Sequence, residues 1–196
     1  MKDNSWNNEQ FHSISWSAYH QAIKKIPRSH RISISKLSHQ LWNTNCQNQK
    51  YYGESNLCPI CNVTPESIDH LYKCEHPSAV ANFQDKLASF KRSLRLKTPN
   101  EIVEHIITGN THWHSNFTPR SPTIGSRLPA LQKLNQAFEA QSELGWAAFL
   151  RDRISSCWLA AYREIYRPKK TSNSKRINIS YGMVGFISYS AFVEAQ

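Results

Sequence analysis

The sequence predicts a mostly α-helical protein, built around one small cysteine and histidine knuckle. Apolar residues recur at spacings of three and four along most of the 196 residues, which is the period of an amphipathic helix. Three of the five cysteines lie within seventeen residues of one another, between Cys58 and Cys74. Basic residues exceed acidic ones, 24 to 14, which gives a net charge of +10 and favours an acidic partner.

The N-terminal part of the chain predicts two helices and a loop. Apolar residues between Phe11 and Ile26 follow the helical period, so we expect a helix over residues 10–26 that ends at Pro27. A shorter helix is expected over residues 34–42, with Leu37 and Leu41 on one face. The polar, glycine-containing stretch that follows, residues 43–56, suits a loop.

The clearest helical pattern begins at Pro77. Val80, Phe83, Leu87, Phe90 and Leu94 repeat at spacings of three and four, and the stripe spans too few heptads for a coiled coil. We interpret it as a face that packs on the core.

A second helix is expected directly afterwards. Thr98, Pro99 and Glu101 combine a capping threonine, a proline at the first helical position and a capping-box glutamate. This pattern predicts a helix of about ten residues that stops at Gly109.

The C-terminal half predicts a linker, further helices and a tail. Residues 111–127 contain two prolines and no periodicity, whereas the helical pattern returns over residues 128–166 as two helices meeting near Gly145 or one long kinked helix. The run RPKKTSNSKR is basic and typical of a mobile segment, and the final residues could form a strand or nothing ordered.

These patterns divide the chain into five parts. They are an N-terminal helical segment (1–57), the knuckle with its following helices (58–110), a polar linker (111–127), a C-terminal helical segment (128–168) and a basic tail (169–196) with the composition of a disordered segment. The net charges of residues 1–57, 58–110 and 111–196 are +4, zero and +6, so the positive charge flanks a neutral middle.

The cysteine cluster has the spacing of a zinc site. Cys58 and Cys61 are separated by two residues, which lets both thiolates of a tight turn reach one ion. His70 and Cys74 are separated by three residues, so they lie one helical turn apart on the same face. Thr64 or Ser67 can cap the helix between the pairs. Four protein ligands leave no position for an activated water, so we expect a structural zinc ion.

Two alternatives remain at this site. His76, two residues after Cys74, is the rival of His70 as the fourth ligand, and the cysteines could instead be buried free thiols. Cys46 and Cys157 are interpreted as ordinary thiols. The odd cysteine number and the absence of a visible secretory signal favour reduced thiols in an intracellular protein.

The same residues resemble a known family. The strings CPIC, PESIDHLYKC and HPSA look like the cysteine-histidine region that follows the polymerase domain in non-LTR retrotransposon-type reverse transcriptases. LWNTNCQNQKYYG is similar to the run that precedes that finger, and AQSELGWAAFLRDRISSCW resembles a segment of retroelement-derived open reading frames. The resemblance covers about residues 32–166.

This resemblance implies zinc on Cys58, Cys61, His70 and Cys74. It also implies contact with RNA or DNA, or support of a neighbouring reverse transcriptase or endonuclease domain. The chain departs from the family because its four aspartates include no adjacent pair to hold catalytic magnesium, so it contains no complete polymerase. It looks like a detached C-terminal piece of such an enzyme.

Nucleic-acid binding would use cations on phosphates and aromatic rings on exposed bases. Trp146 and Trp158 fall within the apolar period, so we expect them in the core. The candidate contacts near the knuckle and in the C-terminal part are Lys50, Tyr51, Tyr52, Lys73, Arg151, Arg153, Arg163, Arg167, Lys169, Lys170, Lys175 and Arg176.

Other functions are less well supported by the sequence. A structural or protein-interaction zinc domain is the main alternative. A metal-dependent nuclease would have to use Glu101, Glu104, His105 and the His112 to His114 loop, which are more typical of a cap, a solvated charge and loop histidines. No apolar stretch reaches the length of a membrane span. The family and the KK and KR pairs of the tail suggest a nuclear location.

Overall fold

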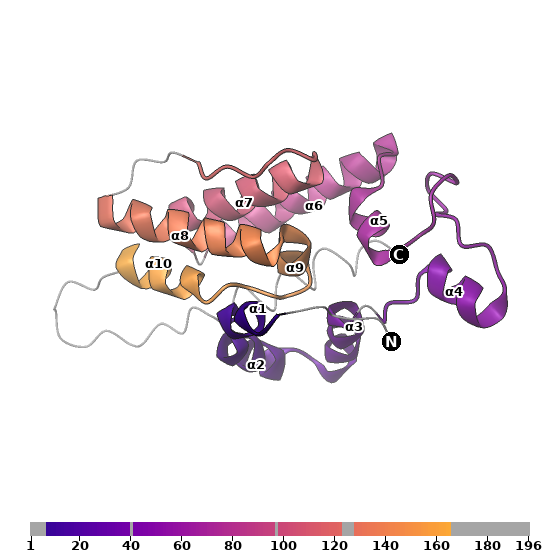
Figure 1. Ribbon diagram of the computed structural model, residues 1–196, viewed down its shortest axis with the longest axis horizontal. Helices are drawn as coiled ribbons and strands as arrows, with labels where there is room; N and C mark the ends of the chain where they lie inside the picture. The colour runs from indigo at the N-terminus through magenta and orange to yellow at the C-terminus, as the bar shows by residue number, and fades with distance from the viewer. Residues whose placement is uncertain (1–6, 40, 97, 123–127, 166–196) are drawn as a thin grey trace.

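The computed structural model describes residues 7–39, 41–96, 98–122 and 128–165 (Figure 1). These residues form ten helices and two isolated β-bridges, which confirms the mostly α prediction. The helices are α1 (Asn8–Ser13), α2 (Trp16–Lys25), α3 (Arg28–Ser38), α4 (Asn45–Tyr52), α5 (Ile68–Lys73), α6 (Pro77–Arg95), α7 (Asn100–His114), α8 (Leu128–Leu144), α9 (Trp146–Leu150) and α10 (Cys157–Ile165).

The long helices α6, α7 and α8 lie side by side, and α10 packs along α8 (Figure 1). Together with α9, their facing sides supply most of the buried apolar side chains of the core. Val103, Ile106, Leu134, Phe149 and Ala161 have no exposed surface, so these side chains are completely buried. Burial of such aliphatic and aromatic side chains is the main source of stability in a helical domain.

The N-terminal helices pack below this layer in Figure 1. The helix expected over residues 10–26 is interrupted at Ile14, which is 5% exposed and pairs with Ser155 in an isolated antiparallel bridge. Ser15 N–H donates to the Ile154 carbonyl at 3.0 Å. A backbone pairing with a distant segment therefore interrupts the local helix, which periodicity alone does not reveal.

Two expectations between residues 27 and 56 are wrong in detail. The second helix begins earlier, at Arg28, because Pro27 starts α3 as well as ending α2; the Arg31 N–H donates to the Pro27 carbonyl. The expected loop contains α4, which ends at Gly53 in the left-handed conformation (φ 72°). Its first N–H group is satisfied by tertiary contact, since Asn45 N–H donates to the Glu66 carboxylate at 2.7 Å.

The helix pair after the knuckle largely follows the prediction. α6 begins with Pro77 at its first position, as expected. α7 does not stop at Gly109 but continues to His114, so it enters the predicted linker. Its start differs from the prediction, because Pro99 is the N-cap, Asn100 is the first helical residue and no side-chain cap forms. Gly109 is thus not a stop signal.

The break expected near Gly145 is confirmed, with Gly145 at φ 91° between α8 and α9. The helix expected after Gly145 is divided into α9 and α10, because residues 151–156 between them are not helical. Trp146 and Trp158 are buried, as predicted. The predicted basic tail and the final apolar stretch lie outside the described residues.

One core joins the predicted segments. Ala22, Ile68, Leu94, Leu134 and Trp158 come from the first, second and fourth segments and belong to the same buried cluster. No helix among the described residues is both long and apolar enough to cross a membrane.

Candidate metal centre

A tight turn presents the first two cysteines. The Cys58 N–H donates to the Thr64 carbonyl and the Asn62 N–H to the Cys58 carbonyl, both at 2.8 Å. Asn62 adopts the left-handed conformation (φ 55°), which asparagine tolerates better than most residues. Leu57 and Pro65 close the base of the turn through an isolated bridge. The loop therefore returns on itself with both thiols on its inner side.

The short helix α5 presents the other two side chains. Ser67 caps it, accepting a hydrogen bond from the His70 N–H at 3.1 Å, as one of the two predicted caps. His70 lies in the helix and Cys74 at its C-cap, four residues later. That spacing places both side chains on the same side of α5, toward the turn.

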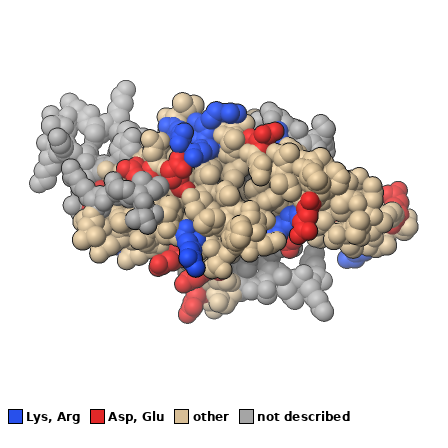
Figure 2. Space-filling model, turned by 90° about the horizontal axis from the view of Figure 1, so that it is seen from above, with Lys and Arg blue, Asp and Glu red and all other residues tan. Residues whose placement is uncertain are grey.

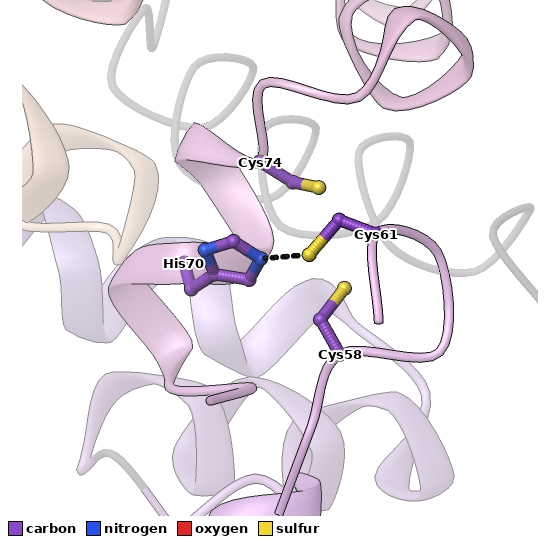
Figure 3. Close-up of side chains that lie close together, drawn as sticks. All are labelled: Cys58, Cys61, His70 and Cys74. Atoms are coloured by element: carbon purple, nitrogen blue, oxygen red, sulfur yellow. Dashed lines mark hydrogen bonds between the residues drawn. The ribbon is translucent and has the colours of Figure 1, made fainter. Parts of the chain in front are cut away.

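The four side chains converge on one point (Figure 3). Their ligand atoms all lie within 4.8 Å of one another, and Cys61 Sγ is 3.4 Å from His70 Nε2. In a tetrahedral site with zinc–sulfur bonds of about 2.3 Å, the sulfurs would be roughly 3.8 Å apart. The cluster is therefore close to the size that a single ion requires, and it can hold a metal ion.

Burial differs between the ligands. Cys58 and Cys74 are 1% and 3% exposed, whereas Cys61 and His70 are half-buried. Cys61 and His70 thus lie on the more exposed side of the cluster, and Cys58 and Cys74 on its buried side.

Hydrogen bonds within the turn favour the thiolate form of one of the cysteines. Hydrogen bonds from the backbone of Thr64 and Val63 lower the pKa of Cys61 to about 6. Burial raises the pKa of Cys74. Since only the thiolate is a metal ligand, the lowered pKa of Cys61 favours its ligand form.

The structure distinguishes His70 from its rival. His76 lies outside the cluster and caps α6: its Nδ1 is 2.7 Å from the Ser78 Oγ and accepts from the Ser78 N–H. The side chain is engaged at the start of a helix, and His70 is the histidine that faces the cysteines.

The knuckle is fixed to the helical core through α5. Ile68 and Tyr72 belong to the buried cluster, so one face of the short helix is a core face. Lys73 lies over the Trp113 ring, 4.8 Å from its centroid, and donates to the Asn116 Oδ1 at 2.7 Å. Lys73, a candidate nucleic-acid contact, therefore ties the knuckle to the end of α7.

Three other candidates are on the surface of α4. Tyr51 and Tyr52 are 67% and 75% exposed, and Lys50 is exposed with its ammonium 5.5 Å from the Tyr51 ring. Exposed aromatic rings beside a cation have the chemistry of a base-stacking site. Their role in nucleic-acid binding stays a prediction.

Arg151 and Arg153 are not surface cations. They are 9% and 6% exposed, and the Arg153 guanidinium donates to the Ser38 carbonyl. Their burial argues against the phosphate contacts expected from the sequence, because a phosphate backbone cannot reach them.

Arg163 is exposed on α10 and remains a candidate. On the face of the molecule seen in Figure 2, lysines and arginines form small groups among acidic and uncharged residues rather than one basic surface. Arg167, Lys169, Lys170, Lys175 and Arg176 lie outside the described residues.

The residues considered for a nuclease do not form a site. His105 is completely buried with its Nδ1 2.6 Å from the Glu101 carbonyl oxygen, and Glu104 is paired with Lys91 and Arg95. His114 stacks on Phe83. Within the described residues, Cys58, Cys61, His70 and Cys74 are the one group of metal-ligating side chains close enough to share an ion.

Comparison with models of protein families, with curated proteins and with solved structures finds no match. The chemistry of the site must therefore be argued from its own residues.

Proposed function

We propose that this protein is a zinc-binding, nucleic-acid-binding module, related to the C-terminal region of a retroelement reverse transcriptase and without polymerase catalytic residues of its own. The observation that carries the proposal is the convergence of three thiols and one imidazole within 4.8 Å. The family origin rests on the sequence resemblance of this same segment.

The donor set favours zinc over other ions. Thiolate and imidazole are ligands for zinc, whereas magnesium and calcium prefer oxygen. Four protein ligands complete a tetrahedron and leave no open position for catalysis, so the ion has a structural role. With three thiolates and a neutral histidine, the zinc centre carries one net negative charge.

Metal analysis tests the zinc proposal. Protein purified without chelator should contain one zinc ion per chain, and Cys58→Ser should lose it. Cys157→Ser is the matched control, because this half-buried thiol lies outside the cluster and should leave the zinc content unchanged. His70→Ala should reduce zinc affinity, whereas His76→Ala should retain the ion. Reduced wild-type protein without bound metal would contradict the proposal.

The surface next to the knuckle supports nucleic-acid binding. α4 leads into the turn and carries exposed Lys50, Tyr51 and Tyr52, which offer a phosphate contact and two stacking platforms. The basic residues of the tail would add electrostatic attraction. In this arrangement the zinc ion fixes the turn and the cations and rings make the contacts.

Binding of single-stranded RNA and DNA at several salt concentrations tests this part. Affinity should fall as salt rises, and Tyr51→Ala with Tyr52→Ala should weaken binding by about tenfold or more, since each stacked base contributes about 1–3 kcal/mol. Leu96→Ala with Leu128→Ala is the control, because both side chains are exposed, at the end of α6 and the start of α8. Absence of binding at low salt would refute the nucleic-acid role and leave the zinc role intact.

A purely structural or protein-interaction zinc domain is the second candidate. The observation that favours it is the attachment of the knuckle to the core through Ile68, Tyr72 and Lys73. A protein that loses its helical packing on zinc removal but never binds nucleic acid would be such a domain.

A further inference from the structure

Helix α3 bears a groove that the zinc and nucleic-acid proposals do not use. The cavity has a volume of about 300 Å³, is open to solvent, and is formed by α3 and the segment just after it. This size is at the small end of ligand pockets, about 300–1,000 Å³, and has room for one or two side chains of a partner. The lining residues are Arg28, Arg31, Ile32, Ser35, Lys36, His39 and Leu41.

The groove has an apolar floor. Ile32 and Leu41 are 54% and 61% exposed, so two large aliphatic side chains of the same groove face water. Covering them would remove apolar surface from water, which contributes about 25 cal/mol of favourable free energy per Å². An occupant must therefore bring an aliphatic or aromatic side chain.

The rim of the groove is cationic and unneutralised. Arg28 and Lys36 are exposed, and neither has an ion-pair partner among the residues that the structure describes. The Arg31 guanidinium donates to the Ile26 carbonyl at 2.6 Å and to the Lys24 carbonyl at 3.3 Å, which fixes its position. An occupant must therefore bring negative charge as well.

The surrounding sequence maintains this positive field. Between Glu9 and Glu54 the chain has no acidic residue, although it has six lysines and arginines. The chain's own residues 166–196 are an unsuitable occupant, because they contain five lysines and arginines and one glutamate. The charge of that segment would repel the rim.

We propose that the α3 groove docks an acidic amphipathic segment of a partner protein, with an apolar side chain on Ile32 and Leu41 and carboxylates on Arg28 and Lys36. A helix with apolar residues at i, i+3, i+4 and i+7 has this chemistry on one face. Nucleic acid fits less well, because the floor is aliphatic and offers no aromatic ring for stacking. This inference is independent of the zinc and nucleic-acid proposals.

Fluorescence anisotropy with a labelled peptide tests the docking. The probe has leucine at i, i+3, i+4 and i+7 and glutamate at the remaining positions, and a scrambled peptide of equal composition is the reference. The full-length, zinc-loaded protein should bind the probe at least about tenfold more tightly than the scrambled peptide, because only the probe gathers its leucines on one face.

Two pairs of matched variants locate the site. Arg28→Glu with Lys36→Glu should weaken probe binding by about tenfold or more, whereas Arg92→Glu with Lys133→Glu, which changes net charge equally, should have a much smaller effect. Ile32→Ser with Leu41→Ser should also weaken binding by about tenfold, and Leu96→Ser with Leu128→Ser, at exposed positions, should not. Circular dichroism verifies that each variant is folded.

Three results would overturn the proposal. The probe could bind no better than the scrambled peptide, or the control variants could weaken binding as much as the groove variants. Alternatively, an oligouridine probe could lose affinity on reversal of Arg28 and Lys36 while the peptide does not bind, which would assign the groove to nucleic acid. If replacing Tyr51 and Tyr52 does not weaken nucleic-acid binding in the earlier test, none of these outcomes changes.

Discussion

At the scale of single residues, Gly109 explains why α7 and α9 can touch. A Cβ atom at this position would overlap with the Trp146 ring, and both residues are buried in the middle of the core. The glycine is helical, so its lack of a side chain matters for packing and not for a special backbone angle. The tryptophan occupies the space that any other residue would fill.

Gly109→Ala should therefore destabilise the protein, although alanine is the better helix former by about 1 kcal/mol. Overpacking a core costs about 1–3 kcal/mol, so after the gain in helix propensity we expect a net loss of up to about 2 kcal/mol in urea unfolding. The loss should shrink when Trp146→Leu is combined with it, because the overlapping ring is then gone. A stabilising Gly109→Ala would show that the core at this point is loosely packed.

Glu104 is a second residue whose environment sets its energetics. Lys91 Nζ and Arg95 Nη2 each lie 2.7 Å from one of its carboxylate oxygens. Burial raises the pKa of Glu104, but the hydrogen bonds and charges of Lys91 and Arg95 outweigh it and hold the pKa below its ordinary value. The carboxylate thereby links α6 to α7.

Because the pKa of Glu104 is lower in the folded state, its ionised form stabilises the fold. This contribution is fully present above the ordinary glutamate pKa of about 4.3, and it disappears as the pH falls through the pKa of the folded state. Glu104→Gln should reduce the free energy of unfolding by about 1 kcal/mol at pH 7. The difference from wild type should vanish in acid, as measured by urea unfolding across pH. Glu139→Gln, an exposed change on α8, should show no such trend.

At the scale of elements, residues 151–156 act as a strap between α3 and the core. The Ser38 Oγ donates to the Arg151 carbonyl at 3.2 Å, and Gln141 donates to the Arg153 carbonyl at 3.1 Å. Burial lowers the pKa of Arg153 to about 10, which still leaves the guanidinium charged at neutral pH. Arg153 is thus a charged side chain in a largely buried site.

Arg153→Met should release α3 while keeping the apolar stem of the side chain. The Ser38 carbonyl loses its charged donor, which should destabilise the fold by about 2 kcal/mol. Hydrogen exchange should accelerate more in α3 than in α7 and α8. Arg163→Met, on the exposed side of α10, is the control, and equal exchange rates in both variants would refute the role of Arg153.

The element pattern also shows how far periodicity predicts this fold. It located α6 and α8, whose apolar residues recur with the helical period and face the core, but it joined α9 and α10 into one helix. It missed α4, whose residues are polar and which is held by the Glu66 contact rather than by a stripe. It also missed the interruption at Ile14, because the competing partner is Ser155. Distant partners carry no local signal.

The metal cluster, in contrast, was predictable because the spacings of its ligands are local. Both ligand pairs are set by short spacings, a turn and a helix, so only the meeting of the two pairs needed the structure. The burial of Arg151 and Arg153 was not predictable from the sequence, because it depends on segments more than one hundred residues away.

At the scale of the whole molecule, charge is distributed unevenly. Residues 166–196 carry a net charge of +4, and the described surface in Figure 2 mixes positive and negative groups. On the proposed function, the tail should therefore contribute much of the salt-dependent attraction to nucleic acid.

Replacing Lys169, Lys170, Lys175 and Arg176 with glutamine should flatten the salt dependence of binding. For a single strand, removing one cation from a phosphate should reduce the slope of log affinity against log salt by about 0.7. A variant with four exposed cations replaced elsewhere, at Lys24, Arg92, Arg120 and Lys133, has the same net charge and should retain the steeper slope. Equal slopes in both variants would show that the tail makes no specific contribution.

The strap at residues 151–156 has a consequence for the order in which the chain folds. Ser15 donates to Ile154, the Ser156 N–H donates to the Ser13 carbonyl, and the bond from Ser38 to Arg151 spans 113 residues. Residues 151–156 follow α1, α2 and α3 by more than one hundred residues, so these helices are synthesised well before the backbone groups that hold them. Closing so long a loop is slow, because the chain must give up its conformational entropy before the stabilising bonds form. We therefore expect α1, α2 and α3 to dock late in folding, after later segments of the chain have formed the core.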